Sequence, residues 1–244
     1  MKTTPFSMNA PARAFFITGT DTEIGKTFTT CALLQRWQQD GLRCVGYKPV
    51  AAGATLVDGQ WVNEDAAQLL AASSPGFSLA DINPLCLQAP MAPHLAARRE
   101  GHRIDTDALL AGFESLRRRA DVVLVEGVGG FIVPLDDETD TAEFARRLGL
   151  PVILVVGLRL GCINHALLTV EAIAHRGLKL AGWIANTVDP HMTGLTDNIA
   201  TLEARIAAPR LGTLPRLDMT NATRAALLLT EPVMTAVLNS PQSS

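Results

Sequence analysis

A glycine-rich loop near the start of the chain constrains the fold more than any other feature. Residues 19–27 read Gly-Thr-Asp-Thr-Glu-Ile-Gly-Lys-Thr, and they follow an apolar run at residues 14–17. Between a strand and a helix, such a loop presents backbone amides and a helix N-terminus to a phosphate group. In loops of this kind the lysine reaches the terminal phosphates and the following hydroxyl can bind Mg²⁺. We therefore predict a nucleoside triphosphate site in which Lys26 and Thr27 take these two roles.

This loop is a variant of the usual Gly-x4-Gly-Lys-[Ser/Thr] pattern. Thr20 stands where the first glycine is expected, and Gly19 lies one residue early. A Gly-Lys-Thr tripeptide alone can be an ordinary helix start. The strand before it, the helix after it and its place near the N-terminus favour phosphate binding.

Short apolar runs alternate with segments of helical periodicity along most of the chain. The predicted strands are residues 14–17, 44–47, 122–125, 152–156, 180–185 and 210–214. The predicted helices are residues 26–40, 63–72, 105–118, 141–148, 163–176, 193–207 and 222–238. This alternation predicts an α/β fold, a doubly wound and mostly parallel sheet flanked by helices, like that of P-loop NTPases. Residues 73–102 show little periodicity and predict a long irregular segment that covers a site.

Length and composition favour one globular domain. The chain has 244 residues, of which 48% are hydrophobic and 18% charged, enough for a packed core. We expect a flexible leader over residues 1–13, without the apolar segment of a signal peptide, and a single domain over residues 14–244. A net charge of −3 gives no bulk attraction to nucleic acid, and no apolar run approaches the ~20 residues of a membrane helix. The spacing of the four cysteines suits neither a metal site nor a disulfide framework, which indicates a cytoplasmic protein.

In a doubly wound sheet, ligands bind at the carboxyl ends of the strands, so the residues that follow each strand are candidates for chemistry. Lys48 follows the second predicted strand, where a second cation would suit phosphoryl chemistry and a surface lysine is an equally good explanation. Glu126 follows the third and precedes Gly-Val-Gly-Gly, a position at which nucleotide enzymes hold Mg²⁺. Asp65 lies at a predicted helix start and, taken alone, is an ordinary N-cap.

The ends of the fourth and fifth predicted strands offer binding groups of other kinds. Residues 161–164 begin a predicted helix whose free amides can bind a carboxylate. Asn186 follows the fifth predicted strand, where its amide either pairs with the edge of an adenine or begins a turn.

Five blocks, in this order and spacing, resemble dethiobiotin synthetase of biotin biosynthesis. They are residues 19–27, 46–50, 125–130, 161–166 and 181–186, and the similarity extends from about Phe15 to Pro215. The resemblance implies an ATP- and Mg²⁺-dependent cyclo-ligase that makes a cyclic urea from 7,8-diaminononanoate and CO₂, releasing ADP and phosphate. One amine captures CO₂ as a carbamate, ATP phosphorylates it, and the neighbouring amine attacks the mixed anhydride. The resemblance also implies a homodimer.

Position by position, the resemblance implies a set of site residues. Lys48 would be the active-site lysine, and Lys26 would bridge carbamate and γ-phosphate. Mg²⁺ would be held by Thr27, Asp65 and Glu126. The nucleotide would be bound by Glu23, Ile24, Gly25, Lys26, Thr27, Phe28, Asp65, Glu126, Gly127, Val128, Gly129, Asn186, Thr187, Pro215, Arg216 and Leu217. The diamino acid would be bound by Thr22 and Ala52 and, across the homodimer interface, by Gly161, Cys162, Ile163 and Asn164.

Three positions depart from the family pattern. Ala52 stands where the family usually has Ser, Thr187 replaces an acidic residue, and Ala222 falls where an acidic nucleotide contact is expected. One alternative is a paralogous ligase with a different substrate. A partitioning-type ATPase is another, but its loop usually carries an early second lysine, and this chain has Thr-Asp-Thr at residues 20–22. A cobyrinate-type amidating synthetase needs a glutaminase domain, for which the chain is too short.

Overall fold

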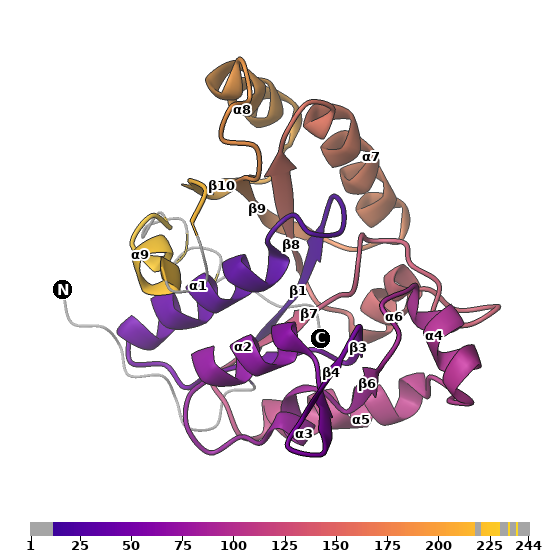
Figure 1. The fold of residues 1–244 in the computed structure, drawn as a ribbon. Helices are drawn as coiled ribbons and strands as arrows, with labels where there is room; N and C mark the ends of the chain where they lie inside the picture. The colour runs from indigo at the N-terminus through magenta and orange to yellow at the C-terminus, as the bar shows by residue number, and fades with distance from the viewer. Residues whose placement is uncertain (1–11, 218–220, 230–233, 235–237, 239–244) are drawn as a thin grey trace.

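A six-stranded parallel sheet forms the centre of the computed structural model, which describes residues 12–217, 221–229, 234 and 238 (Figure 1). The strand order is β10-β9-β8-β1-β7-β2. The strands are β1 (Arg13–Gly19), β2 (Cys44–Tyr47), β7 (Val122–Glu126), β8 (Val152–Leu158), β9 (Leu180–Thr187) and β10 (Arg210–Leu214). The predicted strands are confirmed to within two residues at either end, and Arg13, placed in the predicted leader, already belongs to β1. Residues 1–11 of that leader lie outside the described residues.

Helices cover the sheet. They are α1 (Lys26–Gln39), α2 (Glu64–Ala72), α3 (Leu79–Ile82), α4 (Pro93–Glu100), α5 (Thr106–Arg117), α6 (Thr141–Leu148), α7 (Cys162–His175), α8 (Leu195–Arg205) and α9 (Ala222–Ala226). Strand β8 shows that helices pack against both faces of the sheet. Ile153 and Val155 pack in the larger core with α1, whereas Leu154 and Val156 pack with residues of α7 and α8. Because successive side chains of a strand alternate in direction, a strand covered on both faces is apolar throughout.

The prediction of an irregular segment over residues 73–102 is wrong. This stretch contains α3, the short strand β6 (Leu85–Leu87) and α4. Ser78 and Asp81 form a capping box at α3, and Pro93 is the first residue of α4, a position that proline favours. These elements are too short to show a period, and they are stabilised by contacts with distant residues.

The prediction of one helix over residues 222–238 is also wrong in its first part. Helix α9 ends at Ala226, and Leu229 instead forms an isolated antiparallel bridge with Gly212 of β10. Most of the remaining predicted helix lies outside the described residues.

Three short strands, β3 (Val50–Ala52), β4 (Thr55–Val57) and β5 (Gln60–Val62), lie between β2 and α2. Strand β3 pairs with β6, and β4 pairs with β5 as a hairpin. Asp58 and Gly59 make its turn with φ of 48° and 79°, as an Asp-Gly hairpin turn requires. This hairpin connects β3 to the start of α2.

Two further expectations from the sequence concern membrane-spanning helices and the state of the cysteines. None of the helices in the described part of the chain has the length and apolar character needed to cross a bilayer. All four cysteines are free thiols; Cys31, Cys44 and Cys162 are buried, and Cys86 is half-buried.

Candidate functional site

The loop between β1 and α1 forms a concave anion cradle. Glu23 and Gly25 have φ of 56° and 81°, and this curls the backbone so that successive amides face inward. Gly25 is the N-cap of α1 and has no side-chain cap, which leaves the first amides of the helix available. A side chain at position 25 would collide with the amide of Asn186, so glycine is required there. Lys26 Nζ donates to Asp21 O at 2.8 Å across the loop.

Three ionised side chains meet beside this loop. Lys48 follows β2, Glu126 ends the neighbouring strand β7, and Asp65 lies in the first turn of α2. Lys48 Nζ is 2.7 Å from Glu126 Oε1 and 3.1 Å from Asp65 Oδ2. Thr27 donates to the same Glu126 oxygen at 2.7 Å, and Thr30 lies 2.8 Å from the other one. The fold thus brings together four residues that sequence analysis had selected separately, and adds Thr30.

The surroundings move the pKa values of the two lysines in opposite directions. Burial opposes the charged form of Lys48, but Glu126 and Asp65 more than offset it, and the pKa of Lys48 is raised. Burial and then repulsion by Lys48 lower the pKa of Lys26 to about 8. Burial alone would raise the pKa of Asp65, but the Lys48 cation, which also donates a hydrogen bond to it, holds this pKa below its ordinary value. The two carboxylates therefore favour the charged form of Lys48, which lies between them.

A cavity of about 380 Å³ opens onto these groups. It is lined by Thr22, Glu23, Gly25, Lys26, Thr27, Phe28, Lys48, Ala52, Asn63, Asp65, Gln68, Val128 and Gly129. Most of the predicted phosphate and substrate residues therefore surround one space. Ile24 and Glu126 do not line it, since Ile24 is buried in the core and Glu126 is fully buried behind Thr27 and Lys48.

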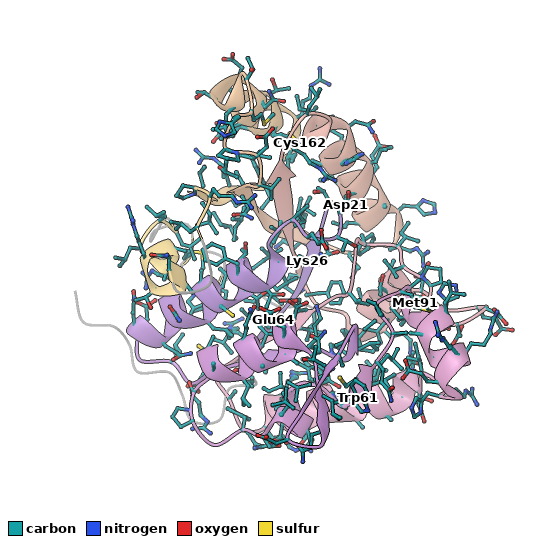
Figure 2. The ribbon with its side chains drawn as sticks, viewed as in Figure 1. Asp21, Lys26, Trp61, Glu64, Met91 and Cys162 are labelled. Atoms are coloured by element: carbon teal, nitrogen blue, oxygen red, sulfur yellow. The ribbon has the colours of Figure 1, made fainter. Side chains whose placement is uncertain are left out.

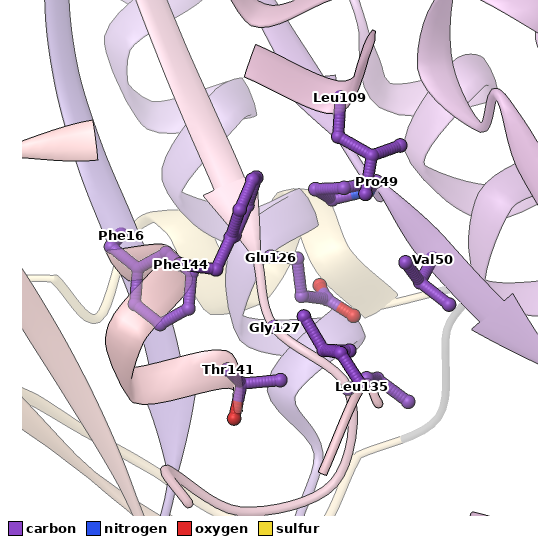
Figure 3. A pocket seen from close by; sticks show the side chains of 10 residues that line it. Phe16, Pro49, Val50, Leu109, Glu126, Gly127, Leu135, Thr141 and Phe144 are labelled. Atoms are coloured by element: carbon purple, nitrogen blue, oxygen red, sulfur yellow. The ribbon is translucent and has the colours of Figure 1, made fainter. Parts of the chain in front are cut away.

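Glu126 also borders a small, mostly apolar pocket. Figure 3 shows Phe16, Leu109, Leu135 and Phe144 around this pocket. Its free space, about 10 Å³, holds about one water molecule. Because these walls are apolar, they give the Glu126 carboxylate no hydrogen bond, and its described donors are Thr27, Thr30 and Lys48.

The predicted adenine residues lie at the ends of β9 and β10, outside the cavity. Asn186 and Thr187 end β9, and Pro215, Arg216 and Leu217 follow the neighbouring strand β10. Asn186 Nδ2 donates to Ile24 O at 2.8 Å, which places this group directly against the phosphate loop.

The predicted carboxylate-binding loop, residues 161–164, also lies outside the cavity but next to the phosphate loop. Gly161 caps α7 with φ of 94°, Cys162 is buried, and Asn164 is exposed. Arg159 forms an ion pair with Asp21, and its carbonyl accepts from Cys162 N at 3.0 Å. Figure 2 shows Asp21 between Lys26 and Cys162.

Sequence analysis missed four residues at or near the site: Asn63, Gln68, Thr30 and Arg159. Asn63 caps α2 by accepting from Ala66 N at 3.2 Å, and its amide donates to Gly53 O at 2.9 Å. An asparagine before two acidic residues is a typical helix start, so the sequence held that signal. For Thr30 the sequence signal is weaker: it lies one helical turn after Thr27 and so on the same face of the helix.

Comparisons with known proteins agree on one family. A family model described as an AAA domain matches residues 13–224. The ATP-dependent dethiobiotin synthetase BioD of Aromatoleum aromaticum is 60% identical over 220 residues, covering 90% of this chain and 98% of that protein. The ATP-dependent dethiobiotin synthetase BioD of Ralstonia nicotianae is 56% identical over 211 residues, covering 86% of this chain and 92% of that protein.

Two solved structures resemble the fold. The septum site-determining protein MinD of Pyrococcus horikoshii OT3, complexed with Mg-ADP, has a TM-score of 0.55 at 15% identity, covering 93% of each chain. The MinD cell division protein of Aquifex aeolicus has a TM-score of 0.56 at 14% identity, covering 96% of this chain and 100% of that one. At such identity the likeness shows the fold alone, a parallel α/β sheet flanked by helices.

Proposed function

Because the chain belongs to the ATP-dependent dethiobiotin synthetase family, we propose that it forms the cyclic urea of dethiobiotin from 7,8-diaminononanoate and CO₂, releasing ADP and phosphate. The observation that best supports this proposal is the Lys48 ammonium, held by Glu126 and Asp65 beside the Lys26 phosphate loop. Phosphoryl transfer needs mainly positioning and charge neutralisation, and two lysines in one cavity supply both. The substrate's own amines attack, so the reaction requires no protein nucleophile.

The two lysines are proposed to have different roles. Lys26 would leave the Asp21 carbonyl and bridge the carbamate and the γ-phosphate, since a charged oxygen accepts more strongly than a neutral carbonyl. Lys48, held by the two carboxylates, would stabilise negative charge on the carbamate as the phosphoryl group is transferred. Thr22 and Ala52 line the same cavity and would contact the diamino acid.

Thr27, Asp65 and Glu126 are proposed to hold Mg²⁺. Their hydroxyl and carboxylate oxygens are the donors that this cation prefers, and an ammonium already lies between the two carboxylates. No group of three or more His, Cys, Asp or Glu suited to a metal occurs among the described residues, so the phosphates and water would complete the coordination. When bound, Mg²⁺ would neutralise charge on the phosphate oxygens.

The ends of β9 and β10 are proposed to bind the adenine. Asn186 uses its amide NH₂ to hold the phosphate loop, and its carbonyl oxygen accepts no hydrogen bond from the described residues, so it can accept from an amino group. Thr187, Pro215, Arg216 and Leu217 lie beside it at the same end of the sheet.

Product analysis tests the reaction. The protein is incubated with ATP, Mg²⁺, bicarbonate and 7,8-diaminononanoate, and dethiobiotin, ADP and phosphate are measured by mass spectrometry. We expect one ADP for each dethiobiotin, and no product when bicarbonate is removed. ATP turnover with another diamino acid, and none with this one, would instead identify a paralogue.

A homodimer is proposed, with the outer face of α7 in the interface. Leu168 and Ile132 are 57% and 56% exposed and line one surface groove with Arg146 and His175. Burying such apolar area drives association.

Leu168→Glu is expected to shift the protein from dimer to monomer and to lower activity, because residues 161–164 would no longer reach the partner's substrate. Analytical ultracentrifugation across a concentration series measures the shift. Leu227→Glu, at an exposed leucine that follows α9, is the control and is expected to remain dimeric. A wild-type protein that is monomeric while active would contradict the proposal.

Ala52→Ser is expected to lower KM for the diamino acid roughly twofold to tenfold and to leave kcat unchanged. Ala52 lines the cavity four residues after Lys48, and a regained neutral hydrogen bond contributes about 0.5–1.5 kcal/mol. A bond made equally in ground and transition states changes KM alone. Steady-state kinetics of the variant measure KM and kcat for the diamino acid. An unchanged or higher KM would mean that the substrate does not reach this position.

A further inference from the structure

The Glu126 carboxylate is fully buried, and all of its described hydrogen bonds come from three side chains. Oε1 accepts from Thr27 Oγ1 at 2.7 Å and from Lys48 Nζ at 2.7 Å. Oε2 accepts from Thr30 Oγ1 at 2.8 Å. The two oxygens are therefore distinguished, since one faces the cavity residues and the other faces Thr30.

The Thr30 hydroxyl has one proton and two acceptors within reach. Its Oγ1 lies 2.9 Å from Lys26 O as well as 2.8 Å from Glu126 Oε2. A carboxylate only accepts, so a separation of 2.8 Å requires a proton from Thr30 between the two oxygens. A bond to a charged acceptor is also stronger than one to a carbonyl. The proton therefore belongs to the Glu126 bond.

The three donors differ in whether they would contact a ligand in the proposed reaction. Thr27 and Lys48 both line the cavity, where each would contact a ligand of its own. Thr30 is fully buried and lies outside the cavity wall. Its bond to Oε2 is the one that ligand entry leaves unchanged.

We propose that Thr30 is a positioning residue, which fixes Oε2 and so directs Oε1 of Glu126 toward Thr27 and the bound cation. This inference rests on the proposed role of Glu126 at Mg²⁺. Side chains that orient a metal ligand from behind typically change metal affinity by about 10–100-fold when they are removed.

The same helix supplies a matched control. Thr29 is the neighbouring residue, is also fully buried, and its Oγ1 has no hydrogen-bond partner in the described structure. At either position, Thr→Val replaces the hydroxyl by a methyl group and keeps the shape of the side chain. Only at position 30 does it remove a bond to Glu126.

The experiment compares Thr30→Val, Thr30→Ser and Thr29→Val with wild type. Mg²⁺ is titrated into protein with ADP and followed by calorimetry, with metal-free ADP binding and thermal unfolding measured alongside. Thr30→Val is expected to weaken Mg²⁺ binding by about 10–100-fold with metal-free ADP affinity unchanged. Thr30→Ser and Thr29→Val are expected to stay within about threefold of wild type, because each keeps the donor to Glu126.

Three results would overturn the proposal: wild-type Mg²⁺ affinity in Thr30→Val, an equal loss in Thr29→Val, or a loss in Thr30→Ser as large as in Thr30→Val. If Thr30→Val does not fold, Thr30→Cys replaces it, and its weaker donor is expected to give an intermediate loss. The calorimetry needs no diamino acid, so it separates this inference from the reaction itself. Failure to form dethiobiotin, with the Mg²⁺ pattern intact, would reject the reaction and leave the role of Thr30 standing.

Discussion

Lys48→Ala is expected to lower kcat by about 10²–10³-fold while ATP still binds. Removing one preorganised charge-stabilising group from a water-poor site has an effect of this size. Lys48 is almost completely buried and contacts both Glu126 and Asp65, whereas the phosphate cradle is built by the separate loop at residues 19–27. Dethiobiotin formation under saturating substrates gives kcat, and calorimetry gives ATP affinity.

This variant needs a control for folding, because it leaves Glu126 buried without its cation. Breaking a buried ion pair by removing one partner costs about 3–5 kcal/mol of stability. Thermal unfolding is therefore measured for each variant, and activity is compared at a temperature where all are folded. Lys179→Ala, at an exposed lysine, is expected to match wild type. Wild-type turnover in folded Lys48→Ala would rule out the proposed catalytic role.

Glu126→Gln is expected to reduce Mg²⁺-dependent ATP turnover by about 10²-fold and to change metal-free nucleotide binding little. The substitution keeps size but removes the fully buried charge, a loss comparable to that of one catalytic electrostatic group. Calorimetry of ADP with and without Mg²⁺ separates metal binding from nucleotide binding.

Asp65→Asn serves as the comparison for Glu126→Gln. The Asp65 side chain is 44% exposed, so solvent screens its charge, and we expect a loss of the same sign but smaller size. Equal losses with and without Mg²⁺ in Glu126→Gln would mean that Glu126 acts on the nucleotide or on the fold, and not through the metal.

Local sequence patterns are sufficient to predict the phosphate loop and the main strands of this protein. The phosphate loop is a local structure, in which Gly25 needs a positive φ and Lys26 follows it directly, so its signal lies within nine residues. The central strands β7 and β8 are buried along their whole length and are almost entirely apolar, so the sequence predicts them without knowledge of their partners. Family resemblance then joined five such local signals into one activity.

The contacts between the predicted site residues depend on the tertiary fold. Thr27 and Glu126 are 99 positions apart in the chain, and Lys48 and Glu126 are 78 apart, yet each pair is bonded at 2.7 Å. The strand order, in which β7 lies between β1 and β2, creates these contacts. Strand order depends on crossovers that span dozens of residues, so it cannot be predicted from local periodicity.

The same reason explains the missed elements and the missed threonine. Helix α4 and strands β3 and β6 are short, so distant contacts rather than their own periodicity stabilise them. Thr30 has the composition and helical position of an ordinary buried threonine, as Thr29 does. What separates the two is a carboxylate 96 positions away from Thr30, and a hydrogen bond of that span exists only after the sheet has formed.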